Sequence, residues 1–497
     1  MPAVSVPAPV GGWNARDSLD AMPATDAIML LNLIPRASYV ESRRGTTLQV
    51  TGLGGTVETL VPYRGASAVA LLAAANGNIW NVTTAGAPSS LGSGFTQDKW
   101  QYTNHSNRVI MTNGADTPRI YNGALSAAVI TGVTASTLWG CNTFKGRVFY
   151  WQQNAQSFWY AAAGAFQGAL AQFDLAATVA SGGTLVQMLT WTLDAGDGVD
   201  DLAVFLFSTG EALVYQGDDP ADAVNWAKIG SFSIGEPISI RSHCRVSNTE
   251  IIATKDGYLD LSQALKDGRY SENSAYSNKI TRAAKDAALR YYSITGWQCI
   301  LYPAGNLFIV NIPISTLQSI QHVRDTNSGG WCQFSNWNAR CFAVHNDALY
   351  FGTATGEVYQ ADVGASDYGN AIPLQGIPAF SALGSKAQRK QLTAVSLISD
   401  YSFPRYLALD GLADFNTTTR STVQSDEAAG TSLWNFATWD VDYWASNTTE
   451  TPQAQPRAWR NLRAAGYSLT CSMRLNITSQ RLTWFSTGYL FNPLGAV

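Results

Sequence analysis

A short pattern of polar and apolar positions recurs along the chain. Each copy places Gly, Asn or Asp at a turn, followed by two to four apolar or aromatic residues, as at 76–82, 107–114, 146–151, 210–217, 256–262, 304–312 and 346–352. Such runs after turn residues are typical of short β-strands. The last four copies begin at residues 210, 256, 304 and 346, which are 46, 48 and 42 residues apart. This spacing predicts four-stranded propeller blades of roughly 40–50 residues each.

A blade cannot bury both of its faces alone, so consecutive blades must stack on one another. The sequence therefore predicts a β-propeller over residues 61–365. A β-sandwich also generates short strands at regular intervals, and it stays open as the alternative for this region.

Two segments have the spacing of helices. Residues 273–292 place apolar side chains at helical intervals, with Ser277 or Asn278 able to cap the start. Within residues 1–60, AIMLLNL after Thr25 or Asp26 predicts a short helix in an N-terminal arm and docking segment.

The repeated pattern of turns and short strands is no longer recognisable after residue 365. Runs at 391–399, 405–411, 468–477 and 481–491 predict strands of a separate antiparallel domain over 366–497. Between them lie Trp434, Trp439 and Trp444, either interface aromatics or buried anchors of this domain. The predicted fold is thus all-β: a β-propeller with an additional antiparallel β-sandwich-like C-terminal domain and one or two short helices.

Composition narrows the function. The 497 residues are 46% hydrophobic and 14% charged, with a net charge of −4. This low, slightly negative charge argues against a protein that binds nucleic acid tightly through electrostatic attraction, because phosphate contacts need clustered Lys and Arg. We expect no secretory signal and no membrane span, since no run of about 20 apolar residues occurs. The six cysteines and four histidines show no zinc spacing.

Motifs for catalysis are missing, and only acidic clusters remain. Asp194, Asp197, Asp200 and Asp201 lie in a Gly-containing segment that would either wrap Ca²⁺ or form a solvated turn. Asp218, Asp219 and Asp222 precede Trp226, which suggests either a glycosidase-like carboxylate pair beside a sugar-stacking ring or an ordinary Asp-Pro loop. We expect no catalytic residue, no metal and no cofactor.

Several phrases together resemble one family. They are GGWNARDSLDAMPATDA (11–27), VYQGDDPADAVNW (214–226), IGSFSIGEPISIR (229–241), ITGWQCILYPAGNLFIVNIP (294–313) and QHVRDTNSGGWCQFSNWNARCFAVHNDALYFGTATGEVYQAD (321–362). Their order and approximate spacing resemble the tail nozzle, or tail hub, proteins of short-tailed bacteriophages, also called packaged-DNA stabilisation proteins. The resemblance covers most of residues 10–365 and is fainter afterwards.

The resemblance implies a non-enzymatic structural protein of the virion tail, assembled in the host cytoplasm. It implies a propeller-containing subunit of a homo-hexamer below the portal and adaptor rings. Such a ring extends the DNA channel, retains packaged DNA until ejection and docks tail fibres or spikes. Its contact with duplex DNA would be transient and non-specific. Asp194, Asp197, Asp200, Asp201, Asp218 and Asp219 then become candidate channel or gate residues.

Two other functions stay open. A receptor-binding or glycan-binding propeller of a phage tail predicts a site where aromatic rings and carboxylates converge on a sugar. A hydrolase on the same scaffold needs two carboxylates about 5–10 Å apart.

Overall fold

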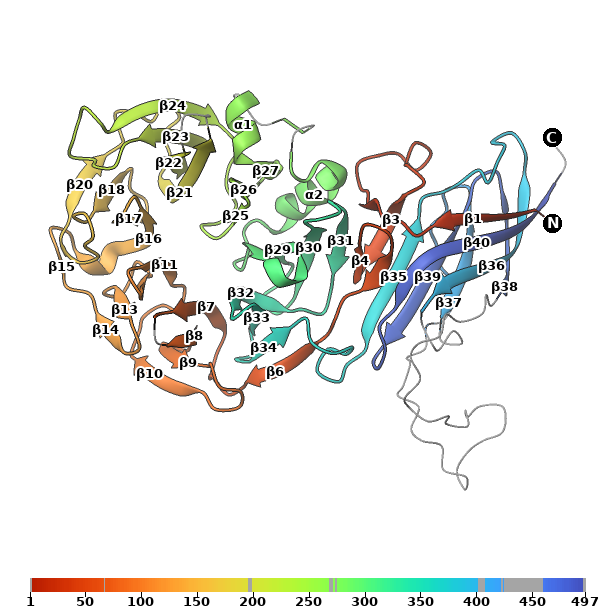
Figure 1. Cartoon of the computed structure of the whole chain (residues 1–497), viewed down its shortest axis with the longest axis horizontal. Helices are drawn as coiled ribbons and strands as arrows, with labels where there is room; N and C mark the ends of the chain where they lie inside the picture. Colours follow the sequence, from red (N-terminus) through yellow and green to blue (C-terminus); the bar gives the residue numbers. More distant parts are fainter. Residues whose placement is uncertain are drawn as a thin grey trace, which may run out of the picture.

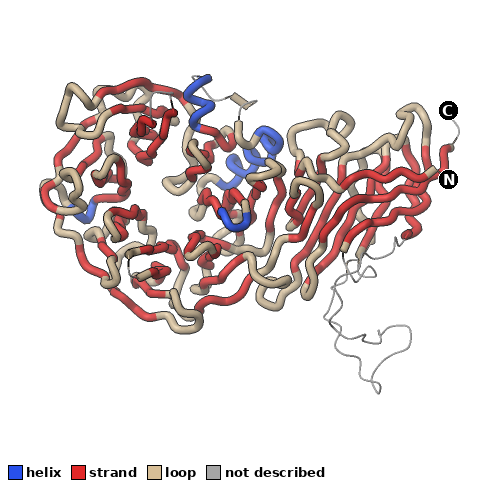
Figure 2. Tube along the Cα trace, in the orientation of Figure 1, coloured by secondary structure: helices blue, strands red, loops and turns tan. Residues whose placement is uncertain are grey.

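The computed structural model describes residues 2–66, 68–194, 199–267, 271–272, 275–400, 407–421, 423 and 459–494. Seven sheets in this part of the chain are arranged in a ring, so the protein contains a β-propeller (Figure 1). Strands make up most of the ring and of the sheets beside it (Figure 2). We number the sheets as blades I to VII in chain order.

The first three blades have four strands each. Blade I contains β7 (Val57–Arg64), β8 (Val69–Ala75), β9 (Asn78–Asn81) and β10 (Ser89–Ser93). Blade II contains β11 (Gln101–His105), β12 (Arg108–Thr112), β13 (Arg119–Tyr121) and β14 (Leu125–Ala127). Blade III contains β16 (Leu138–Phe144), β17 (Arg147–Gln152), β18 (Ser157–Tyr160) and β20 (Ala171–Asp174). Beside it, β15 (Ile130–Thr131) pairs in parallel with β19 (Gly168–Ala169).

Blade V is the exception among the remaining blades. Blade IV contains β21 (Leu185–Asp194), β22 (Val199–Phe207), β23 (Glu211–Gln216) and β24 (Ala227–Ser233). Blade V has three strands, β25 (His243–Val246), β26 (Thr249–Thr254) and β27 (Gly257–Asp260). The helix α1 (Leu261–Asp267) follows and buries Leu261, Ala264 and Leu265 in the core shared with blade IV.

The last two blades connect to other parts of the chain. Blade VI contains β28 (Gln298–Tyr302), β29 (Leu307–Pro313), β30 (Ser319–Asp325) and β31 (Trp331–Phe334). Blade VII contains β32 (Ala339–His345), β33 (Ala348–Thr353) and β34 (Val358–Ala361), and its fourth strand is β6 (Thr46–Val50). Because β6 directly precedes blade I, its pairing with β34 closes the ring.

Each of the seven repeated phrases falls in a different blade, which confirms the predicted propeller. Asn, Asp and Gly recur at these turns because the backbone there has positive φ angles. Asn76 and Gly77 both have positive φ, as do Asn346 and Asp347, and 106–107 and 145–146 share this pattern. Two consecutive positive φ angles define the type I′ turn, whose twist suits a tight hairpin and which favours Asn, Asp and Gly.

A second pair of sheets, here called the lateral sheets, lies beside blade VI (Figure 1). One sheet has the order β38-β36-β40-β5-β4, with β1 also paired to β40. The other continues blade VI in the order β31-β3-β35-β39-β37, with β2 paired to β3. The strands are β1 (Ala3–Pro7), β2 (Gly12–Trp13), β3 (Asp26–Leu31), β4 (Leu33–Pro35), β5 (Val40–Ser42), β35 (Ile372–Pro378), β36 (Lys390–Ser399), β37 (Ala408–Ala413), β38 (Trp459–Gly466), β39 (Leu469–Ile477) and β40 (Thr483–Pro493).

The lateral sheets combine both ends of the chain. The segment expected to be a docking arm, 1–60, supplies β1–β5, and the segment 366–497 supplies the rest. A single apolar core runs from blade VI, through Phe308 and Trp331, to Leu374, Met473 and Tyr489 of the lateral sheets. The ring and the lateral sheets therefore share one core.

The two helix predictions have different outcomes. The helix α2 (Thr281–Tyr291), preceded by the 3₁₀ turn η2 (Asn278–Ile280), confirms the helix predicted within residues 273–292. The other 3₁₀ elements, η1 (Ala135–Thr137) and η3 (Pro303–Gly305), are single turns. Ser277 does not cap α2, because its hydroxyl accepts the backbone N–H of Tyr258 at 3.0 Å. The helix predicted after Thr25 is wrong, since Asp26–Leu31 is β3. A continuous apolar run suits a strand buried between neighbours as well as a helix, and here β35 and β31 pair with it.

Glycines allow the close approach of the two parts at their joint. Gly12 has φ +86°, and a Cβ there would lie 2.5 Å from the backbone nitrogen of Trp331. A Cβ on Gly330 would lie 2.7 Å from the side chain of Pro35. Any larger residue would therefore push the N-terminal strands away from blade VI.

Arg43 locks the same joint with a buried charge. Its side chain is 1% exposed and donates to both carboxylate oxygens of Asp367, at 2.8 and 2.5 Å. It also donates to Asn32 Oδ1 at 2.9 Å and to the Ser335 carbonyl at 2.9 Å, and it lies 5.0 Å from the Trp337 ring centroid. Removing one partner would leave a charge without compensation in a dry site.

We predict that Asp367→Ala lowers the free energy of unfolding by about 3–5 kcal/mol, measured by urea unfolding. The control is Asp20→Ala, which breaks only the exposed pair with Lys386 (3.1 Å) and should cost less than about 1 kcal/mol. Equal effects of the two substitutions would contradict the role given to Arg43.

Candidate functional site

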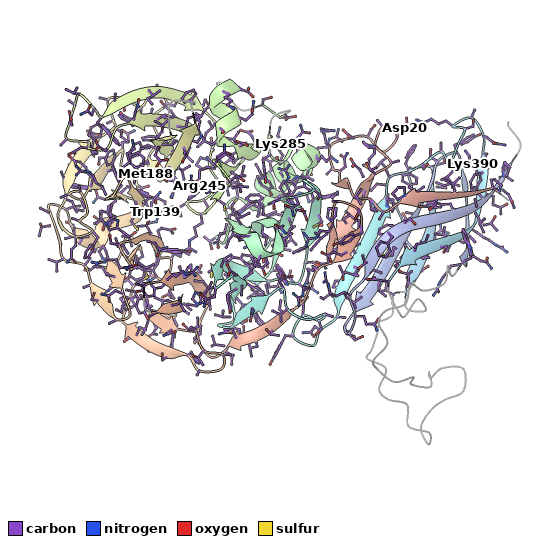
Figure 3. All side chains as sticks on the ribbon, in the orientation of Figure 1. Asp20, Trp139, Met188, Arg245, Lys285 and Lys390 are labelled. Atoms are coloured by element: carbon purple, nitrogen blue, oxygen red, sulfur yellow. The ribbon has the colours of Figure 1, made fainter. Side chains whose placement is uncertain are left out.

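The propeller axis contains two cavities. One of about 460 Å³ is lined by Glu58, Gln97, Lys99, Gln101, Trp139, Gln153, Val186, Arg340 and segments 237–241 and 292–297. The other, of about 440 Å³, is lined by residues that include Tyr102, Asn142, Trp151, His243, Gln298 and Phe342. The lining comes largely from the first strand of each blade, which identifies these as the inner strands. Figure 3 labels Trp139, Met188 and Arg245 on three of them.

Arg241 lies between the two cavities and lines both, together with Gln101 and Ile240. Its guanidinium donates to the carbonyls of Glu58 (2.8 Å) and Trp100 (2.6 Å) and to Thr59 Oγ1 (2.7 Å). A longer bond of 3.3 Å reaches Gln101 Oε1. These acceptors belong to blades I and II, whereas Arg241 precedes β25 of blade V. The side chain therefore ties opposite sides of the ring together.

A turn before β25 carries Arg241 into the axis. Ile238 donates its backbone N–H to Ala253 (3.2 Å), and Ala253 donates to Ser242 (2.6 Å), so both ends of the turn bond to β26. Ser242 donates its N–H to the Ser239 carbonyl at 3.1 Å, which closes the turn, and Ser239 Oγ accepts the backbone N–H of Arg241 at 3.0 Å. The Arg241 carbonyl accepts the N–H of Cys299 in β28 at 2.9 Å, so the backbone of the turn is held from both neighbouring strands.

Cationic side chains outnumber carboxylates in the lining of the larger cavity. Its lining carries the cations Lys99, Arg241 and Arg340 and the carboxylate of Glu58. Arg340 lies 3.3 Å from Glu58 Oε1 and donates to the Thr295 carbonyl at 2.7 Å. Arg241 and Arg340 are thus both held by protein acceptors in the lining of this cavity.

Burial keeps two thiols beside the smaller cavity in the protonated form. Burial raises the pKa of Cys141 and of Cys244 to about 12, so both stay protonated at neutral pH. All six cysteines are free, and Cys332 and Cys341 do not form a disulfide.

The acidic residues expected from the sequence lie in blade IV, away from the lining of the axial cavities. Asp219 pairs with Arg147 at 2.6 Å, and Asp218 lies beside it in the loop after β23. Asp201, in β22, accepts a hydrogen bond from Thr192 Oγ1 at 2.7 Å. Asp194 ends β21 and Asp200 lies in β22, and their side chains, like the whole of Asp197, are outside the described part.

A sugar platform at Trp226 is ruled out. The ring is only 5% exposed and stacks on Tyr215 at 5.4 Å within the core of blades III and IV. Trp434, Trp439 and Trp444 lie outside the described residues. Within the described ranges, no three His, Cys, Asp or Glu side chains are grouped to hold a metal ion.

The axial tie was not predicted, because the partners of Arg241 lie between 140 and 183 residues away in the sequence. Several segments that carry the family resemblance nevertheless contain residues of this axial contact or of the joint between the propeller and the lateral sheets. IGSFSIGEPISIR ends on Arg241, and SNWNAR contains Trp337 and Arg340. GGW and SGGW bring Gly12 against Trp331, and Trp13 packs edge-on against His322 with centroids 5.2 Å apart.

Comparison with known proteins gives structural similarity only. No family model matches the chain, and no curated protein is similar to it. Similar solved structures include BBS1N in complex with ARL6DN (8% identity, 66% of this chain and 99% of that chain, TM-score 0.41). Others are the β-propeller domain of Cps50 (Swd1) from Myceliophteria thermophila (11%, 64% and 99%, 0.40) and the computationally designed Ika8 protein (11%, 67% and 96%, 0.37). The propeller assignment therefore rests on the sheets of this chain. No helix among the described residues has the length and apolar character needed to span a bilayer.

We predict that Arg241→Ala lowers the free energy of unfolding by about 2–3 kcal/mol, because three close hydrogen bonds to buried acceptors are lost. Urea unfolding followed by tryptophan fluorescence measures this. Arg245→Ala, at an exposed position of the adjoining strand with one bond to Thr192 (2.9 Å), is the matched control and should stay within about 0.5 kcal/mol. An unchanged free energy of unfolding in Arg241→Ala would contradict the role of Arg241 in joining opposite sides of the ring.

Stability should also depend on pH through His322. Burial lowers the pKa of this imidazole to about 3, and its Nδ1 lies 2.8 Å from the Tyr258 hydroxyl. The unfolded chain binds the proton near pH 6.5, so the contribution of His322 is complete above that pH and is lost as pH falls towards 3. The expected slope approaches about 1.4 kcal/mol per pH unit below pH 6.

The measurement is the urea midpoint between pH 7.5 and 5. His322→Gln keeps an acceptor for Tyr258 and should reduce the slope. An undiminished slope in His322→Gln would assign the pH dependence to other groups.

Proposed function

We propose that this protein is a structural, non-enzymatic subunit of a hexameric tail nozzle in a short-tailed bacteriophage. The observation that supports this most is spatial. Phrases of the resemblance that are more than 300 residues apart, GGWNARDS and SGGWCQFSNWNAR, meet at the joint between the propeller and the lateral sheets. A resemblance carried by residues that hold the whole architecture together favours a shared architecture.

The axial tie bears on where DNA would pass. Arg241 spans the propeller axis, and the cavities on either side hold about 460 and 440 Å³. Duplex DNA has no room in such cavities. In the proposed nozzle, the passage therefore lies between six subunits, and each propeller is a solid wall element.

Assembly into a closed ring needs contacts between two different surfaces of the same subunit. The lateral sheets project to one side of the propeller and offer such a surface (Figure 1). We propose that they and a propeller face form the contact. The ring would then hang from the adaptor, and the segment with Trp434, Trp439 and Trp444 would contact a neighbouring subunit or a tail fibre.

The acidic loops of blade IV remain the proposed channel or gate elements. Asp194, Asp197, Asp200 and Asp201 add negative charge to one hairpin, which would keep a duplex from binding tightly. Asp218 and Asp219 are weaker candidates, since Arg147 offsets the charge of Asp219.

The test is the mass and shape of the purified chain at rising concentration, by sedimentation velocity and negative-stain imaging. We expect six-fold rings, formed alone or on addition of the phage's portal–adaptor complex. A chain that stays monomeric in both conditions would contradict the nozzle. A variant with Trp434→Ala, Trp439→Ala and Trp444→Ala distinguishes the two contacts proposed for this segment. If the tryptophans contact a neighbouring subunit, the variant's hexamer should be weaker; if they contact a tail fibre, the hexamer should be unchanged.

A further inference from the structure

A groove of about 430 Å³ lies on the outer part of blade VII, away from the axis. Its walls come from β33, β34, the turn between them, Thr46 of β6 and the loop 366–370, and we call it the blade VII groove. Ligand pockets commonly have volumes of about 300–1,000 Å³, so the groove is large enough for a small ligand.

Aromatic rings form a continuous array from the core to this groove. Phe351 and Tyr359 are opposite one another on β33 and β34 and stack with centroids 5.5 Å apart. Tyr368 meets Tyr359 edge-on at 5.8 Å and is 56% exposed. Trp337 stacks beneath Phe351 at 6.0 Å. The outermost ring therefore stands in solvent on a rigid aromatic support.

The loop that carries Tyr368 is held in place. Asp367 is fixed by the two bonds from Arg43, and Asp367 and Asn370 exchange backbone hydrogen bonds, each 2.9 Å long. Tyr368 donates its N–H to Thr46 at 2.9 Å and has φ +48°, which is unusual for a tyrosine. A loop backbone held this way needs little ordering when a ligand arrives.

Polar side chains surround the rings. The Thr353 hydroxyl donates to Glu357 Oε2 at 2.7 Å, Thr355 donates to the same oxygen, and Glu357 Oε1 accepts no bond from a described residue. Asn336 and Asn338 also line the groove, and each side-chain amide carries two N–H donors. The Asn338 Oδ1 already accepts the backbone N–H of Ser319 at 3.4 Å. The described lining includes no Lys or Arg, so nothing there would compensate an anionic ligand.

We infer that the blade VII groove binds a neutral saccharide. The apolar C–H face of a sugar ring would pack on Tyr368 and Tyr359, while Glu357, Asn336 and Asn338 would bond to its hydroxyl groups. No bond is broken in this role. It goes beyond the nozzle function and does not depend on ring assembly.

The test is isothermal calorimetry of the full chain with glucose, galactose, mannose, N-acetylglucosamine and their disaccharides, each at up to about 20 mM, well above a Kd of about 1 mM. Sialyllactose and glucuronic acid are the anionic comparators. We expect saturable binding of at least one neutral sugar and weaker binding of the acidic sugars. Absence of saturable binding to every neutral sugar would overturn the inference.

Variants locate the site. Tyr368→Ala should weaken binding by about tenfold or more, and Glu357→Gln should also weaken it. Tyr467→Ala removes a similarly exposed ring (41%) from the lateral sheets and is the matched control. Binding that survives Tyr368→Ala unchanged would overturn the groove. Sugar binding by a chain that forms no hexamer would reject only the nozzle. A hexamer that binds no neutral sugar would reject only the groove.

Discussion

The architecture depends on a buried guanidinium at the place where two parts of the molecule meet. Arg43 comes from the N-terminal strands, Asp367 from the segment after the last blade, and Ser335 and Trp337 from the turn between blades VI and VII. A charge in such a site is tolerated only when every partner is present. The joint therefore forms as a whole or fails as a whole, and it fixes the direction in which the lateral sheets leave the propeller.

That fixed direction would matter in the proposed six-membered ring. Small angular errors between two parts of one subunit would accumulate around a six-membered ring. Gly12 lies against the backbone of Trp331 and Gly330 against the ring of Pro35, so the two parts touch closely at positions that leave little freedom to shift. Arg241 acts similarly inside the propeller, where it joins blade V to blades I and II. Both devices suit a rigid building element, in keeping with the proposed nozzle.

The propeller could be predicted from the sequence because its signal is local. The turns at 76–77 and 346–347 need positive φ at two successive residues, and only a few residue types accept it. By contrast, Asp26–Leu31 gave no local signal that separates a strand from a helix, and its pairing with β35 decided the matter. The Arg241 tie and the blade VII groove were invisible for a related reason. Tyr359 and Tyr368 are close in sequence, but Thr46 and Asn336 reach the groove only through the fold.

The pairing of β6 with β34 joins strands that lie far apart in the sequence. Thr46–Val50 is synthesised before blade I, yet its partner ends at Ala361, and β1 must wait for β40 near Pro493. Such long-range contacts are slow to form, and unpaired strands are prone to aggregate meanwhile. The edge of β6 therefore stays unpaired until β34 has been made, and that of β1 until β40 has been made. We expect the yield of folded protein in a cell to depend on how well those waiting strands are shielded.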